Sequence, residues 1–98
     1  MDAKQKSLIL IIDDETEIRN LLHDILSPFY EIIEAADGNE GIEQLKHHRP
    51  DLIISDIIMP NMSGVELLNE IKKSRLTSHI PVVFLSSKAT MDDQISNY

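Results

Sequence analysis

The sequence predicts a single α/β domain with a doubly wound, mostly parallel β-sheet. Two observations predict it. Four short, mainly apolar runs alternate with segments whose apolar residues recur at helical spacing. The connections between these segments are short, which favours right-handed crossovers between parallel strands. At 98 residues the chain can hold one modest core, and therefore one domain.

The first half of the chain is predicted to form two strands and two helices. Residues 8–12 are apolar throughout, as in a strand buried on both faces. An apolar stripe at i, i+3, i+4, i+7 and i+8 then predicts a helix, which Pro28 ends. The stripe comprises Ile18, Leu21, Leu22, Ile25 and Leu26. Residues 30–35 contain two glutamates and are expected to form a charged edge strand, and residues 39–48 a second helix.

The second half is predicted to continue the alternation. Residues 52–60 run from apolar side chains into Asp56 and stop at a proline, which predicts a central buried strand with a carboxylate at its carboxyl end. Residues 65–74 are expected to form a third helix and residues 82–85 a fourth strand. A fourth helix is expected to begin near residue 90.

Composition excludes several classes of function. The net charge of −8 argues against binding to nucleic acid, although it permits cations and basic partners. The absence of cysteine excludes disulfides and thiolate metal sites. No apolar run is long enough to cross a bilayer, and the polar residues 1–6, an expected flexible tail, do not resemble a signal peptide. A cytoplasmic protein without membrane contact is expected.

Polar side chains follow three of the predicted strands: Asp13 and Asp14 after the first, Asp56 at the end of the third, and Ser86 after the fourth. In open α/β sheets, ligands bind at this carboxyl edge. Carboxylates about 4 Å apart repel by ~1 kcal/mol in water and ~4 kcal/mol at an effective dielectric of 20. Either one of them is protonated or a cation lies among them, and an all-oxygen donor set favours Mg²⁺.

Such a site suits phosphoryl transfer, in which a carboxylate attacks phosphorus beside a divalent ion. Each residue also has a structural interpretation when taken singly. Asp13 and Asp14 could cap a helix, Asp56 could be a turn residue, and Ser86 could be a cap or turn residue. Their joint position at one sheet edge favours chemistry.

The pattern closely resembles the receiver domain of two-component response regulators over nearly the whole chain. The residues that carry the resemblance are Asp13-Asp14, Asp56 with Met59-Pro60 and Gly64, and Pro81-Val82-Val83-Phe84-Leu85-Ser86. The resemblance implies a flavodoxin-like sheet, with strand order 2-1-3-4 in this chain. It implies that Asp56 accepts a phosphoryl group from the phosphohistidine of a histidine kinase or a phosphotransfer protein.

The resemblance also implies roles for the neighbouring residues. Asp13, Asp14 and Asp56, with the backbone carbonyl of Ile58, would hold Mg²⁺, and Ser86 would be the switch hydroxyl. In the family, the side chains at the positions of Ile58 and Lys88 are associated with variation in rate. Such a domain is a signalling module rather than an enzyme, with at most self-phosphorylation and autodephosphorylation.

One departure from the family pattern concerns the fifth strand, whose lysine would fall about twenty residues after Ser86. The sequence ends at Tyr98, so residues 7–98 are interpreted as a partial receiver domain lacking the fifth strand and helix. Phosphorylation and switching are accordingly expected to be impaired. The uncovered fourth strand is expected to seek a partner, for example in a homodimer.

Two alternatives from other classes remain open at this point. The first is a Mg²⁺-dependent phosphohydrolase acting through an aspartyl phosphate, although Ile58 stands where such an enzyme usually has a second aspartate. The second is an interaction domain that does not depend on phosphorylation and keeps its acids only as caps. Binding of Mg²⁺ that depends on Asp14 would argue against the second alternative.

Overall fold

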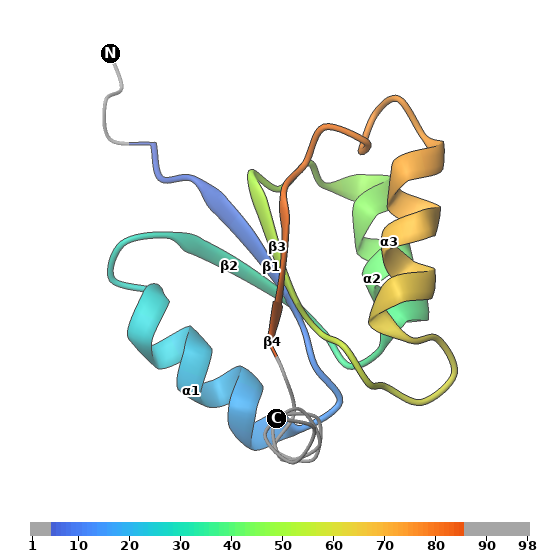
Figure 1. Cartoon of the computed structure of the whole chain (residues 1–98). Coiled ribbons are helices and arrows are strands. Elements are labelled where there is room, and N and C mark those ends of the chain that lie inside the picture. Colours follow the sequence, from blue (N-terminus) through green and yellow to red (C-terminus); the bar gives the residue numbers. More distant parts are fainter. Residues whose placement is uncertain (1–4, 86–98) are drawn as a thin grey trace, which may run out of the picture.

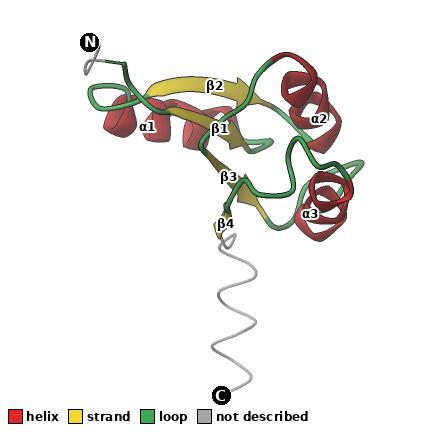
Figure 2. Cartoon of the chain, turned by 90° about the horizontal axis from the view of Figure 1, so that it is seen from above, coloured by secondary structure: helices red, strands yellow, loops and turns green. Residues whose placement is uncertain are grey.

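The computed structural model describes residues 5–85, which form a four-stranded sheet with three helices (Figures 1 and 2). The elements in chain order are β1 (Leu8–Ile12), α1 (Thr16–Leu26), β2 (Glu31–Ala35), α2 (Gly38–His47), β3 (Leu52–Asp56), α3 (Gly64–Lys73) and β4 (Val82–Leu85). All three strand pairings are parallel, in the order β2-β1-β3-β4. The predicted strand order and fold class are therefore confirmed.

The register of the sheet brings the carboxyl ends of its strands together. Ile12, the last residue of β1, pairs with Ala35 of β2 and with Ser55 of β3. One position further, Asp56 pairs with Leu85 at the end of β4. Residues that directly follow β1 therefore lie beside the last residue of β3.

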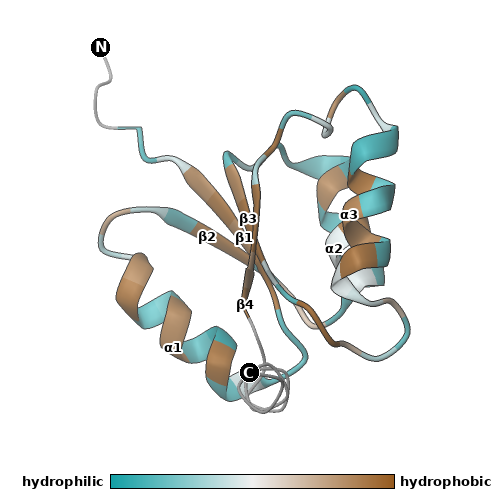
Figure 3. Ribbon diagram, viewed as in Figure 1, coloured by the Kyte–Doolittle hydropathy of each residue, from teal (hydrophilic) through white to brown (hydrophobic). Residues whose placement is uncertain are grey.

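The main core lies between the sheet and the pair α2 and α3, which cover one face while α1 lies on the other (Figure 1). Apolar residues dominate the strands and the sheet-facing sides of these helices (Figure 3). The buried residues of this core are Leu10, Ile12, Ala35, Leu45, Ile53, Met59, Leu67, Ile71 and Ile80. Burying each leucine, isoleucine or methionine side chain of this core stabilises the fold by roughly 1.5–3 kcal/mol.

The helix that the apolar stripe predicted is confirmed as α1, but the stripe itself is only partly covered. No residue of α1 is buried, and Leu21 and Ile25 are each 54% exposed. The helix packs on β1 and β2, at one side of the sheet, so part of its stripe extends past the surface that it covers. Helical periodicity predicts which residues share a face, but it does not predict how much of that face is covered.

Side-chain caps fix the first residues of α2 and α3. Asp37 caps α2 by accepting a hydrogen bond from the amide of Glu40 at 2.8 Å. Ser63 and Glu66 form a capping box at the start of α3, with reciprocal side-chain bonds of 3.1 and 2.9 Å. Both helices begin one residue earlier than predicted as a result.

Some predictions fall outside the described residues: the fourth helix, Ser86 and Lys88. β2 is one residue shorter than predicted, and β3 ends at Asp56 as expected from its apolar run. Among residues 5–85, no helix is long and apolar enough to cross a membrane.

Candidate functional site

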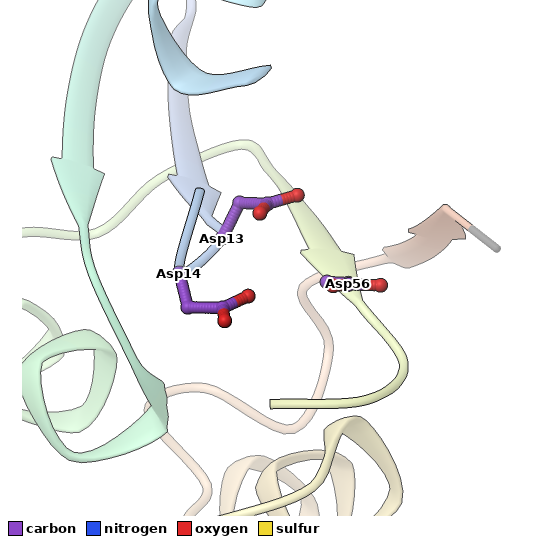
Figure 4. Close-up of side chains that lie close together, drawn as sticks. All are labelled: Asp13, Asp14 and Asp56. Carbon is purple, nitrogen blue, oxygen red and sulfur yellow. The ribbon is translucent and has the colours of Figure 1, made fainter. Parts of the chain in front are cut away.

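Three carboxylates meet at the carboxyl edge of the sheet. β1 and β3 are neighbours, so Asp13 and Asp14, which follow β1, lie beside Asp56 at the end of β3. Figure 4 shows the side chains of Asp13 and Asp14 extending toward the end of β3. One carboxylate oxygen from each residue lies within 4.8 Å of those from the other two. The structure thus brings together the three acids that the sequence singled out.

Asp13 is held rigidly at this edge. Its amide donates to the carbonyl of Ala35 at 3.1 Å, and its Oδ1 accepts from the amide of Glu15 at 2.9 Å. The residue is only 4% exposed. The amide that it binds belongs to the residue preceding α1, and Glu15 itself makes no side-chain cap. Asp13 therefore orders the loop before the helix, and the interpretation as a helix cap is wrong.

Asp56 is 6% exposed, and its Oδ1 accepts from the amide of Ile57 at 2.8 Å. The following backbone turns tightly, because the amide of Gly64 donates to the carbonyl of Ile57 at 2.7 Å. Asp14, in contrast, is exposed. The site therefore combines two buried carboxylates with one that faces solvent.

The electrostatics of the site favour either a proton or a cation. Burial raises the pKa of Asp13, and the negative charges of Asp56 and Asp14 add to this effect, while the amide of Glu15 opposes it. Burial also raises the pKa of Asp56, as does the charge of Asp14, against the lowering effect of the amides of Ile57 and Ile58. Desolvation and repulsion together disfavour three ionised groups without a counter-ion.

The donor set fits Mg²⁺. Hard divalent ions prefer oxygen ligands, and Mg²⁺ in particular is usually held by one or two carboxylates together with water and phosphate oxygens. Among the described residues, these three aspartates are the one group of three or more potential metal ligands close enough to share an ion. The exposure of Asp14 leaves an approach for solvent and for a phosphoryl group.

Two further residues support the site through contacts that residue patterns alone do not predict. Gly64 is one of the residues that carry the family resemblance, and a Cβ there would lie 2.6 Å from the carbonyl oxygen of Asp56. Arg19 was not singled out, yet its Nη1 donates to the carbonyl of Asp13 at 2.7 Å. The spacing of an arginine on the first turns of a helix after paired acids was the only available signal.

The outcomes for the remaining predicted site residues differ. The side chain of Ile58 is 57% exposed at the rim of the site, and its carbonyl as a metal ligand remains a prediction. Ser86 and Lys88 lie outside the described residues, so the roles expected for them also remain predictions.

Comparison with known proteins agrees with this geometry. Residues 9–98 match the family model for the response regulator receiver domain. The chain is 43% identical over 88 residues to histidine kinase P4 of Formosa agariphila, covering 90% of this chain and 6% of that protein. It is 34% identical over 92 residues to response regulator Rre1 of Synechocystis, covering 92% of this chain and 40% of that protein.

Solved structures show the same fold. The N-terminal domain of a response regulator receiver protein from Methanoculleus marisnigri superposes with a TM-score of 0.79 at 33% identity, covering 92% of this chain and 77% of that one. The chain belongs to the receiver-domain family of two-component signalling. Receiver domains bind Mg²⁺ at an acidic pocket and are phosphoacceptor modules that interact with histidine kinases or phosphotransfer proteins.

Proposed function

We propose that Asp56 of this chain accepts a phosphoryl group from a phosphohistidine. One carboxylate oxygen of Asp56 forms the new P–O bond while the P–N bond to the donor imidazole breaks. The imidazole keeps the electron pair of that bond and takes up a proton. The observation that carries the proposal is the buried Asp56 carboxylate, with oxygens of Asp13 and Asp14 within 4.8 Å.

The protein's own groups prepare Asp56 for this reaction. The amides of Ile57 and Ile58 hydrogen-bond the carboxylate and favour its ionised form, which is the nucleophile. Asp13 and Asp14 would hold Mg²⁺ together with Asp56, and the carbonyl of Ile58 is the further ligand that we expect. When bound, the ion would neutralise phosphoryl oxygens and reduce the repulsion of a donor by three acids.

The donor, the ion and the location are parts of the same proposal. The donor is a histidine kinase or a phosphotransfer protein, Ser86 is the switch hydroxyl, and the chain acts in the cytoplasm as a signalling module rather than a turnover enzyme. Ile58 follows Asp56 by two residues and offers no acid for a phosphohydrolase, which disfavours that alternative.

We further propose that copies of this chain associate through β4. Among the described strands, β4 pairs only with β3, and Val83 on it is 47% exposed. A twofold axis beside β4 would join two such strands in antiparallel fashion and cover both edges. In this proposal the partner on the β4 edge is a second copy of the chain.

A labelling experiment tests the phosphoacceptor role. The intact chain is incubated with acetyl phosphate or phosphoramidate, with Mg²⁺ or with EDTA, and analysed by intact-mass spectrometry. We expect one added phosphoryl group with Mg²⁺, acid-stable and labile to hydroxylamine as an acyl phosphate is, and none in EDTA. Asp56→Asn should abolish it, and Asp51→Asn, at the opposite end of β3, should not. Labelling that persists in Asp56→Asn would contradict the proposal.

A further inference from the structure

Arg19 joins three separate parts of the fold around the acid site. Its Nη1 donates to the carbonyl of Asp13 at 2.7 Å, and its Nε lies 3.3 Å from Oε1 of Glu34 on β2. A longer bond of 3.4 Å runs from Nη2 to Oγ1 of Thr16 on the same helix. The arginine side chain is 17% exposed and that of Glu34 31%. Arg19 thus connects α1, the edge strand and the loop that carries the acids.

The bond to Asp13 acts on the peptide that leads into Asp14. The carbonyl of Asp13 shares one planar peptide unit with the amide and Cα of Asp14. A donor that fixes this carbonyl therefore fixes the direction in which Asp14 leaves the backbone. Asp13 is already held through its amide and its side chain by Ala35 and Glu15. The peptide between Asp13 and Asp14 is held by the hydrogen bond that the Arg19 side chain donates to the Asp13 carbonyl.

Glu34 keeps the guanidinium in this geometry. Arginine has a planar fork of donors, so a partner for Nε leaves Nη1 directed elsewhere, here to the Asp13 carbonyl. A lysine could supply the charge but not two such bonds in fixed directions. The pair is partly buried, so it is screened by water less than an exposed ion pair.

We propose that Arg19 is a positioning residue that orients Asp14 for Mg²⁺ by holding the peptide between Asp13 and Asp14, with Glu34 as its anchor. This inference rests on the proposed function, because it concerns the same ion site. The direction of the change in Mg²⁺ affinity when Arg19 is replaced distinguishes positioning from a purely electrostatic role. A cation near the site repels Mg²⁺, so loss of its charge alone would strengthen Mg²⁺ binding, whereas loss of positioning weakens it.

Calorimetric titration of the intact chain with Mg²⁺ tests the proposal. We expect Arg19→Gln to weaken Mg²⁺ binding about tenfold, the scale typical of groups that orient metal ligands. Arg19→Lys should also weaken it, because the charge remains but the paired bonds do not. Glu34→Ala should weaken it less, and combining it with Arg19→Gln should add little further loss. Lys46→Gln, which removes an exposed cation paired with Glu43, should leave it unchanged.

Backbone amide spectra of the ion-free protein give a second readout. Arg19→Gln should shift the Asp14 amide resonance while leaving those of α3 in place, which also shows that the variant is folded. If Arg19→Gln does not fold, the Mg²⁺ titration and the amide spectra of Arg19→Lys test the role of Arg19 instead. Unchanged or tighter Mg²⁺ binding in the folded variant would overturn the role of Arg19. Failure of the wild-type chain to bind Mg²⁺ would instead overturn the proposed function.

Discussion

Gly64 lies so close to Asp56 that a Cβ at this position would be 2.6 Å from the Asp56 carbonyl oxygen. The same Cβ would be 3.0 Å from Cα of Ile57 and 2.8 Å from the ring of Phe84. Two of these three contacts are with backbone, which cannot rotate away. The start of α3 and the end of β3 can therefore approach this closely only with glycine at position 64.

We expect Gly64→Ala to destabilise the protein by about 1–3 kcal/mol, the usual cost of forcing an extra carbon into a packed site. Because the displaced backbone carries Asp56, Mg²⁺ binding should weaken as well. Urea unfolding measures the first effect and calorimetric titration the second.

Gly41→Ala is the matched control for this substitution. Its Cβ would also meet an atom at 2.6 Å, but that atom is Cδ1 of Ile12, the end of a flexible side chain. Alanine inside a helix is favoured over glycine by up to about 1 kcal/mol, which offsets part of the crowding. A loss for Gly41→Ala as large as that for Gly64→Ala would contradict the assigned role of the rigid backbone contact.

The acid site should make the ion-free protein less stable as pH rises. Burial raises the pKa of Asp56 in the folded state, so the folded state holds its proton at pH values where the unfolded chain has lost it. Stability from this group therefore falls as pH rises from about 4 through the folded pKa. Asp56→Asn should therefore have a higher free energy of unfolding than wild type at pH 7 in EDTA, measured as a higher midpoint in urea unfolding.

This advantage should vanish below about pH 4, where the carboxyl is protonated in both states. Asp24→Asn removes a carboxylate whose side chain is 84% exposed and should show no comparable gain at neutral pH. Equal stability of Asp56→Asn and wild type at pH 7 in EDTA would show that repulsion and burial at the site cost little.

Mg²⁺ should stabilise the wild-type chain through Asp14. An ion that binds only the folded state adds about 2.7 kcal/mol when its concentration is a hundred times Kd. Thermal unfolding should show a higher Tm with Mg²⁺ than with EDTA, and Asp14→Ala should remove most of this difference. Glu15→Gln, at the next exposed position, should retain it. A shift in Tm that is the same in Asp14→Ala would place the ion elsewhere.

The sequence predicted well whatever depends on local pattern. The unbroken apolar run of β3 ends at Asp56, and the parallel register then places Asp13 beside it. What it did not predict depends on distances between segments. The bond from Arg19 to Glu34 joins residues fifteen apart, and the restriction at Gly64 arises from the path of the loop after β3. Neither has a periodic signature.

The association through β4 gives a prediction that is independent of the ion site. Lysine on an exposed strand edge opposes pairing with another strand, because its charge would be brought against the partner. We expect the chain to form dimers in sedimentation experiments at high concentration, and Val83→Lys to be monomeric. The control is Val65→Lys, which changes an apolar residue of α3 that is 56% exposed. This variant should still form dimers. If the wild-type chain stays monomeric at all concentrations, pairing through β4 is refuted.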